Sequence, residues 1–201
     1  MTAADAPDHT PQMSTPGTSI AFPLRSERLL VRPFEEADAP AAHAVYGDAE
    51  VMRFVGDGRP TSLRETVEMI EGYRRHQRER GFAFWAVLAA DDGQLIGDAG
   101  LEVTAHGVEL GYTLGRPWWG RGLATEAAEL CVDAALGPLG VRCLVALADE
   151  HNPRSARVLE KVGFTAERRV TAYGRPHMRF VHTASGAQPR SSRRQGRPSG
   201  S

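Results

Sequence analysis

Apolar positions recur along the chain with two different periods, and the changes between them predict an order of helices and strands. Alternating or continuously apolar runs predict strands at 28–34, 82–90, 94–103, 108–115, 141–148, 165–171 and 177–183. Apolar positions three to four apart predict helices at 36–46, from 61 or 62 to 79, 121–136 and 153–162. This order is typical of one α/β domain built on a mixed sheet.

Turn residues between these segments indicate how the strands connect. Asp91, Asp92 and Gly93 separate two strand-like runs, which predicts a hairpin. The run 141–148 is nearly continuously apolar, as in a strand that is buried on both faces. We therefore expect an antiparallel meander, a strand–helix–strand crossover, one more helix and a closing hairpin.

Composition divides the chain into three parts. Residues 1–22 are rich in Thr, Pro, Ala, Asp and Ser without periodicity, and residues 184–201 combine Ser, Gly and Pro with four arginines. Such segments cannot bury enough apolar surface to fold, so both ends are predicted to be disordered tails around a domain at 23–183. The basic tail has two interpretations, a solvated tail or a contact for RNA or an acidic partner.

Charge and cysteine content exclude several classes of protein. The 24 basic and 25 acidic side chains nearly cancel, so we expect no nucleic acid and no membrane as partner. Cys131 and Cys143 lie in apolar periodic segments without a second ligand at metal-binding spacing, which predicts two packed thiols and no metal. No apolar run reaches the ~18 residues of a membrane span, and the first twenty residues lack the features of a signal peptide, so we expect a cytoplasmic protein.

The segment 117–128, PWWGRGLATEAA, joins a predicted strand to a predicted helix through Gly120 and Gly122. Each glycine inside a helix costs roughly 1 kcal/mol relative to alanine, so packing alone does not favour two of them there. Glycines before a helix let a phosphate approach free backbone N–H groups and the positive end of the helix. A chance loop is the alternative interpretation.

Two common phosphate motifs do not fit this glycine turn. A dinucleotide fingerprint needs a third glycine where Thr125 stands and an acidic residue where Arg142 stands. A Walker loop needs a lysine after its second glycine, and the only lysine in the chain is Lys161. Neither a dehydrogenase nor a P-loop enzyme is predicted.

Three segments together resemble a known family. They are SERLLVRPFEEADA at 26–39, ELGYTLGRPWWGRGLATEA at 109–127 and NPRSARVLEKVGF at 152–164. Their order and separation are similar to those of the GNAT superfamily of acetyl-CoA-dependent N-acetyltransferases, and the nearest branch is the RimJ/RimL-like one, which acetylates ribosomal-protein N-termini. The resemblance covers residues 26–183. It implies a mostly antiparallel sheet with a central parallel strand pair, helices on both faces, acetyl-CoA as co-substrate and no metal.

The resemblance also implies where coenzyme A binds. Its pyrophosphate would contact backbone amides of Trp119, Gly120, Arg121, Gly122, Leu123 and Ala124. Its pantetheine arm would lie along the strand 109–114, at Tyr112, Thr113 and Leu114, where two strands splay apart. Asn152 would touch the cofactor, and it is equally suited to cap the helix that follows.

Amide formation needs a neutral amine, whereas a terminal amino group has a reference pKa of about 7.7 to 8.0. Glu109, on the central strand, is the predicted proton acceptor, and a plain surface or salt-bridging glutamate is the alternative. A backbone N–H near Gly111 or Tyr112 is expected to hold the thioester oxygen as negative charge develops.

One position departs from the commonest form of the superfamily. Where many members carry a tyrosine that protonates the departing thiolate, this chain has Leu159. Ser155, one turn earlier, is the predicted substitute and a further cofactor contact, with helix hydrogen bonding as the alternative. Trp85 and Tyr112 are predicted to line the acceptor pocket, with core packing as the alternative for Trp85.

These observations predict an N-acetyltransferase that moves an acetyl group to a primary amine by direct attack in a ternary complex. The acceptor is a protein N-terminus, such as that of a ribosomal protein, or a small molecule, and a homodimer is possible. The loop 47–62 and the closing hairpin, with Tyr173 and His177, are expected to shape the acceptor pocket. The alternatives are a coenzyme A-binding module without turnover and a ribosome- or RNA-associated protein that uses the basic tail.

Overall fold

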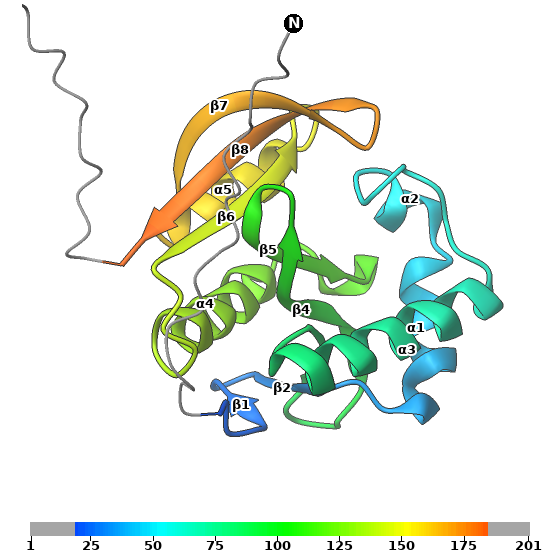
Figure 1. Ribbon diagram of the computed structural model, residues 1–201. Helices are drawn as coiled ribbons and strands as arrows, with labels where there is room; N and C mark the ends of the chain where they lie inside the picture. The colour runs from blue at the N-terminus through cyan, green and yellow to red at the C-terminus, as the bar shows by residue number, and fades with distance from the viewer. Residues whose placement is uncertain (1–18, 185–201) are drawn as a thin grey trace, which may run out of the picture.

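The computed structural model describes residues 19–184, which form an eight-stranded sheet with helices on both faces (Figure 1). The strand order is β1-β2-β3-β4-β5-β6-β8-β7, and every neighbouring pair is antiparallel except β5 and β6. The strands are β1 Leu24–Arg25, β2 Leu29–Pro33, β3 Phe84–Ala89, β4 Leu95–Thr104, β5 Gly107–Leu114, β6 Cys143–Asp149, β7 Thr165–Ala172 and β8 Arg175–Thr183. The predicted mixed sheet with one central parallel pair is confirmed.

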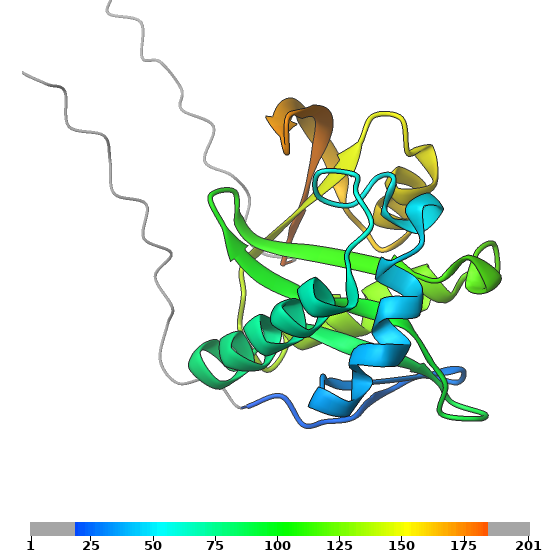
Figure 2. The ribbon, with the colours of Figure 1, turned by 90° about the vertical axis from the view of Figure 1, so that its right-hand side faces the viewer.

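The helices divide between the two faces of this sheet (Figure 2). They are η1 Glu36–Asp38, α1 Ala39–Tyr46, α2 Ala49–Met52, α3 Leu63–Arg80, η2 Arg116–Trp118, α4 Leu123–Leu136 and α5 Pro153–Lys161. Helices α1 and α3 cover one face over a small apolar cluster, whereas α4 and α5 cover the other face over the main core. No helix in residues 19–184 is long and apolar enough to cross a membrane.

Local sequence signals explain where these helices begin and end. Ser62 caps α3 and exchanges hydrogen bonds with Glu65, and Gly81 ends the helix in the left-handed conformation with φ 80°. Helix α5 ends at Lys161 and is followed by Gly163, whose φ is 90°, and the Phe164 N–H donates back to the Leu159 carbonyl at 3.0 Å. The pattern predicted both ends within two residues.

The structure differs from the sequence prediction at several places. Strands and helices as short as β1 and α2 have too few residues to show a period, and neither was predicted. Helix α4 begins at Leu123 rather than at 121, because Gly122 is left-handed. Cys131 is buried as expected, but Cys143 is exposed at the beginning of β6, so the prediction of two packed thiols is wrong for Cys143.

The domain was predicted to begin at residue 23, but packed residues begin earlier in the chain. Ile20 is buried in the main core, and the Phe22 ring packs edge-on against the Trp85 ring with 5.3 Å between centroids. The remaining residues predicted to be disordered, 1–18 and 185–201, lie outside the described residues.

Strands β5 and β6 pair only at their beginnings, and this feature positions the site. The paired residues are Val108 with Leu144 and Glu109 with Val145. Beyond Glu109, β5 keeps its pairing with β4 and β6 keeps its pairing with β8. The two parallel strands therefore part after Glu109, and one edge of β5 is left without a neighbouring strand.

Candidate active site

A cavity of about 980 Å³ lies where β5 and β6 part. Residues from both faces of the sheet line it, from the beginnings of α4 and α5 on one face to α2 and α3 on the other. Eleven residues predicted for the site line this one cavity: Glu109, Tyr112, Thr113, Leu114, Trp119, Gly120, Gly122, Leu123, Ala124, Asn152 and Ser155. The fold thus joins the two sequence blocks at a single site.

The glycine turn before α4 presents free backbone donors to this cavity. Gly120 and Gly122 have φ values of 73° and 80°, in the left-handed region that other residues enter at a cost of roughly 1–2 kcal/mol. A Cβ on Gly120 would meet nothing within 4 Å, so its backbone conformation rather than crowding requires glycine. Because no side chain caps α4, its first N–H groups are available to an anion.

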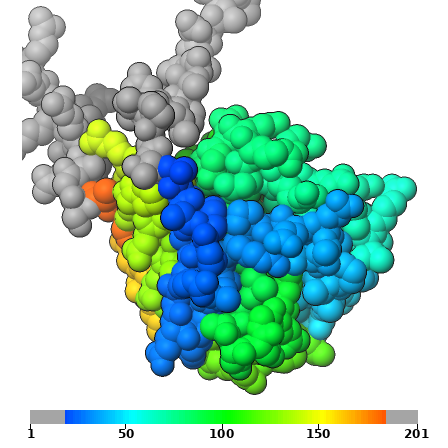
Figure 3. Space-filling model, turned by 90° about the horizontal axis from the view of Figure 1, so that it is seen from below, coloured from blue at the N-terminus to red at the C-terminus, as the bar shows by residue number. Residues whose placement is uncertain are grey.

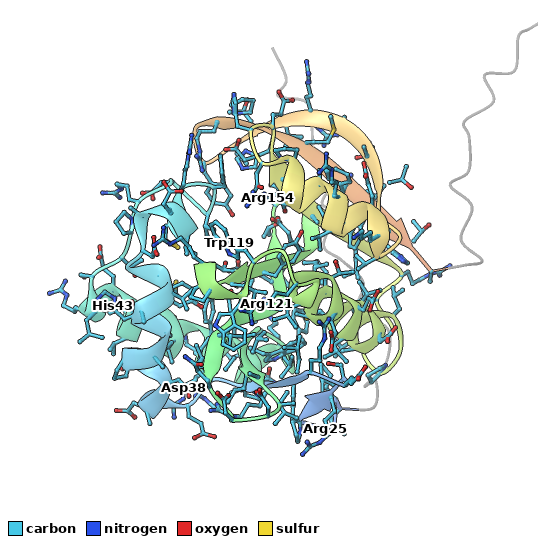
Figure 4. All side chains as sticks on the ribbon, turned by 180° about the vertical axis from the view of Figure 1, so that it is seen from behind. Arg25, Asp38, His43, Trp119, Arg121 and Arg154 are labelled. Carbon is cyan, nitrogen blue, oxygen red and sulfur yellow. The ribbon has the colours of Figure 1, made fainter. Side chains whose placement is uncertain are left out.

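Basic side chains on α5 complement this helix start. Arg154, Arg157 and Lys161 stand three and four positions apart, on one face of the helix, and line the cavity. No ion pair within residues 19–184 involves them. Figure 4 shows Arg154 at the beginning of α5, across from the turn that carries Trp119 and Arg121. These charges suit a ligand with several phosphates.

Arg121, a predicted cofactor contact, does not line the cavity. Its guanidinium lies over the Trp118 ring, 5.2 Å from the ring centroid. Its backbone carbonyl accepts a hydrogen bond of 2.9 Å from Arg28 Nη1. The side chain thus packs on the turn, and only its main chain belongs to the helix start.

Arg28 and Glu126 tie this turn to the first strands, and sequence reasoning missed them. Arg28 Nε donates to Glu126 Oε2 at 2.8 Å, and the Ser26 hydroxyl donates to Oε1 at 2.5 Å. Burial alone would raise the pKa of Glu126, but the hydrogen bonds from Ser26 and Arg28 outweigh it and lower that pKa. Figure 3 shows the first strands lying against α4. Arg28 therefore neutralises a carboxylate in the first turn of the helix and holds the preceding carbonyl.

The open edge of β5 offers main-chain groups to a ligand. The Gly115 N–H donates to Ile96 on β4 at 2.9 Å, and alternation along the strand then turns the Tyr112 and Leu114 main chains toward the gap. Trp119 Nε1 already donates to the Leu114 carbonyl at 2.6 Å. Of the two predicted donors for the thioester oxygen, Gly111 and Tyr112, the alternation favours Tyr112.

Glu109 stands at the point where the strands part. Its Oε2 accepts a hydrogen bond of 3.0 Å from the Thr104 hydroxyl, and its cross-strand partner on β4 is Glu102. Burial raises the pKa of Glu109, the Thr104 bond opposes this, and the negative charge of Glu102 adds to the rise. A raised pKa makes the carboxylate a better proton acceptor near neutral pH.

Ser155 lies in the first turn of α5, beside a phenol. Its backbone N–H donates to Asn152 Oδ1 at 3.3 Å, so Asn152 does cap the helix. The Tyr112 hydroxyl lies 2.9 Å from Ser155 Oγ and 3.0 Å from the Ser155 carbonyl oxygen. Leu159, where a tyrosine is common in the superfamily, is packed into the core.

Trp85 does not line the cavity, so its predicted acceptor contact is corrected. The side chain is fully buried, and its Nε1 donates to Gln77 Oε1 at 2.7 Å. Its neighbour Phe84 points to the other face and lines the cavity, where a Cβ added to Gly111 would lie 2.6 Å from the ring. Strand alternation required one of the two aromatic residues to be core, but the pattern alone does not tell which.

Asp98 is a further lining residue that sequence reasoning missed. It is only 2% exposed and pairs across the strands with Thr113. Burial raises the pKa of Asp98 to about 7, although the nearby polar groups of Tyr46 and Thr113 oppose that rise. Neither Asp98 Oδ1 nor the Tyr46 hydroxyl has a hydrogen-bond partner within normal geometry among the described residues. An aspartate inside the apolar run LIGDAGL was the available signal.

Arg175, in the closing hairpin, connects the two segments predicted to shape the acceptor pocket. It donates to the Arg53 carbonyl at 2.8 Å and to the Gly56 carbonyl at 3.1 Å, and it forms an ion pair of 3.3 Å with Asp149. His177 is buried and lines the same cavity. In residues 19–184, no group of three or more His, Cys, Asp or Glu side chains is arranged to hold a metal ion.

An uncapped helix start, an open strand edge and a half-buried carboxylate lie on one cavity, an arrangement that suits a transferase acting on a phosphate-bearing acyl carrier. The family described as acetyltransferase (GNAT) domain matches residues 28–165. The chain therefore belongs to the GNAT family and is an acetyl-CoA-dependent N-acetyltransferase. The predicted family is confirmed.

Curated relatives cover most of the domain. YoaA of Bacillus subtilis, an uncharacterised N-acetyltransferase, is 29% identical over 73% of this chain and 85% of its own length. The [ribosomal protein uS5]-alanine N-acetyltransferase of Escherichia coli is 26% identical over 72% of this chain and 78% of its own length. The spermidine N(1)-acetyltransferase of Escherichia coli is 26% identical over 68% of this chain and 73% of its own length.

Solved structures agree with this assignment. An acetyltransferase from Agrobacterium tumefaciens has a TM-score of 0.71 and 27% identity over 82% of this chain and 96% of its own. RimL, a ribosomal L7/L12 alpha-N-protein acetyltransferase in complex with coenzyme A, has a TM-score of 0.68 over 79% of this chain and 95% of its own. Because its identity is 18%, that likeness shows the fold alone.

Proposed function

We propose that this protein transfers the acetyl group of acetyl-CoA to a primary amine by direct attack in a ternary complex. The observation that carries the proposal is the parting of β5 and β6 at Glu109, above a cavity into which the uncapped start of α4 also opens. One cavity thus contains both a candidate phosphate-binding site and a candidate proton acceptor. Holding both reactants there supplies an effective molarity of ~10⁵–10⁸ M, more than the ~10²–10⁴-fold of acid–base help.

Different parts of the site bind the pyrophosphate and the pantetheine arm of coenzyme A. The N–H groups at Gly120, Gly122 and Leu123 hold the pyrophosphate, and Arg154 and Arg157 add positive charge. The open edge of β5 pairs with the pantetheine arm as an added strand does. These roles combine main-chain groups of the glycine turn and of β5 with basic side chains of α5.

The chemical roles follow from position. Glu109 accepts the proton that the acceptor ammonium loses, directly or through water, and the neutral amine attacks the thioester carbon. The attacking nitrogen loses its second proton to water as the amide forms. The Tyr112 N–H stabilises the carbonyl oxygen as it becomes negative. When the carbon–sulfur bond breaks, its electron pair stays on sulfur, to which the Ser155 hydroxyl donates a hydrogen bond.

The acceptor is a protein N-terminus or a small amine. Relatives named for each kind of acceptor match this chain with similar identity, and the aromatic and acidic lining of the α2–α3 side suits an amine of either kind. An alternative function is a coenzyme A-binding module without turnover. A second alternative is RNA binding by the basic tail. Residues 185–201 lie outside the described residues, and comparing the RNA affinity of the protein with and without them tests this alternative.

The test combines binding with turnover. Titration calorimetry of the purified protein with coenzyme A is expected to show one site, and thiol release from acetyl-CoA is expected with at least one member of an amine panel. The panel contains peptide N-termini, polyamines, amino acids and aminoglycosides, and mass spectrometry identifies the acetylated product. Binding without any thiol release would favour the binding module, and no binding would refute the proposal.

Replacing Arg28 with alanine is expected to weaken coenzyme A binding by about tenfold, the loss that one charge-assisted hydrogen bond implies. The change leaves Glu126 as an uncompensated negative charge in the first turn of α4, and it frees the Arg121 carbonyl. Calorimetry measures the affinity, and Arg25→Ala, an exposed arginine on β1, is the matched control. An unchanged affinity in a folded Arg28→Ala protein would contradict this role.

A further inference from the structure

The cavity contains a phenol that the proposed reaction leaves unused. The Tyr112 side chain reaches from β5 to the first turn of α5, where its hydroxyl lies 2.9 Å from Ser155 Oγ and 3.0 Å from the Ser155 carbonyl oxygen. Both residues line the cavity. A tyrosine is therefore present beside the predicted proton donor, although it comes from the sheet and not from the Leu159 position on α5.

The two hydroxyl groups have two hydrogens to distribute, and two arrangements satisfy the distances. In the first, the Tyr112 hydroxyl donates to the Ser155 carbonyl, and Ser155 Oγ donates to the tyrosine oxygen. In the second, Tyr112 donates to Ser155 Oγ, and the serine hydrogen is free to point into the cavity. Only the second arrangement lets Ser155 donate to a ligand while its oxygen keeps a partner.

Negative charge in the cavity favours the second arrangement. A hydroxyl that accepts one hydrogen bond becomes a better donor of another, because hydrogen bonds in a chain polarise each other. Burial raises the pKa of Tyr112 to about 12, and the bond to Ser155 opposes this rise, so the phenol keeps its own proton at neutral pH. Tyr112 therefore acts as a donor to Ser155 and does not itself become charged.

We propose that Tyr112 is a positioning residue that, through its hydrogen bond to Ser155, aims the serine hydroxyl at the sulfur of the departing thiolate. The inference rests on the proposed function. The carbon–sulfur bond breaks with its electron pair on sulfur, Ser155 donates a hydrogen bond to that sulfur, and Tyr112 donates to Ser155. No proton leaves either hydroxyl. The acceptor ammonium loses one proton to Glu109 before attack, the attacking nitrogen loses a second proton to water as the amide forms, and the products are the amide and the thiolate.

A double-mutant cycle tests the coupling. Tyr112→Phe removes the hydroxyl and keeps the ring, and it is expected to lower kcat by about five- to tenfold, with the affinity for coenzyme A unchanged within about twofold. Because Tyr112 acts through Ser155, the double variant with Ser155→Ala is expected to be no slower than Ser155→Ala alone. Thermal unfolding of each variant shows that it is folded.

A second readout does not depend on turnover. The ultraviolet absorbance of the thiolate reports the pKa of the thiol of bound coenzyme A, and this pKa is expected to be lower in the wild-type protein than in Tyr112→Phe or Ser155→Ala. If the wild-type protein binds coenzyme A but acetylates no amine, the proposed function fails, and this measurement still tests the pair. Equal thiol pKa values in all three proteins, additive losses in kcat, or a loss confined to coenzyme A affinity would overturn the inference.

Discussion

Replacing Glu109 with glutamine is expected to lower kcat by about 10²- to 10⁴-fold at neutral pH, the range that general base catalysis supplies. Glutamine keeps the size of the side chain and can still accept the Thr104 hydrogen bond, but it cannot take a proton. Steady-state thiol release measures the effect. Coenzyme A affinity is expected to stay within about twofold, because neutral N–H donors and α5 arginines hold the phosphates.

Glu102→Gln is the matched control for this prediction. Glu102 faces Glu109 across β4 and β5 and carries the same charge, but it is exposed and does not line the cavity. Its replacement is expected to change kcat little and to move the acidic limb of the pH–rate profile to lower pH, because its charge helps to raise the pKa of Glu109. A Glu109→Gln rate within about threefold of wild type would mean that water alone takes the proton.

The order of elements could be predicted because each has a clear period or a clear end. Helix α3 combines Ser62 and Glu65 at its start with Gly81 at its end, and the hairpin of β3 and β4 has Asp and Gly in its turn. The hydrophobic pattern does not determine which face of a strand meets the main core. Trp85 and Phe84 illustrate this limit, since either could have been the buried one.

The candidate phosphate-binding site could also be predicted, because main-chain N–H groups form it and the two glycines before the helix are visible in the sequence. Side chains that support the site could not, because their partners are far apart in sequence. Arg28 is 98 residues from Glu126, and Tyr112 is 43 residues from Ser155. Neither partner belongs to a local motif, so only the folded chain brings these groups together.

Asp98 was missed for a different reason. The apolar run predicts a strand over 94–103 that includes Asp98, but the pattern does not show that the carboxyl group is buried beside a cavity. The strand runs through Gly97, Asp98 and Gly100, with close backbone contacts at both glycines that leave no room for a Cβ. The carboxyl group is thereby buried beside Tyr46 and Thr113.

This burial predicts a loss of stability as pH rises from about 4 to about 7. The pKa of Asp98 is about 7 in the folded protein, against 3.8 as its ordinary value. In that window the unfolded chain has lost a proton that the folded chain keeps, so the free energy of unfolding falls with pH and levels off above about 7. At 1.36 kcal/mol per pKa unit, the fall is on the order of 4 kcal/mol.

Asp98→Asn isolates this contribution, because asparagine is nearly the same size and stays neutral at every pH. The wild-type free energy of unfolding, measured by urea denaturation, is expected to fall across the window, and that of the variant to change much less. Asp38, Glu126 and Asp149 do not mimic the effect, since their pKa values are lowered and they lose stability as pH falls. Glu102→Gln, which removes an exposed carboxylate from the same strand, is expected to keep the wild-type slope. Superimposable curves for wild type and Asp98→Asn would mean that the Asp98 carboxyl is ionised and solvated in the folded protein.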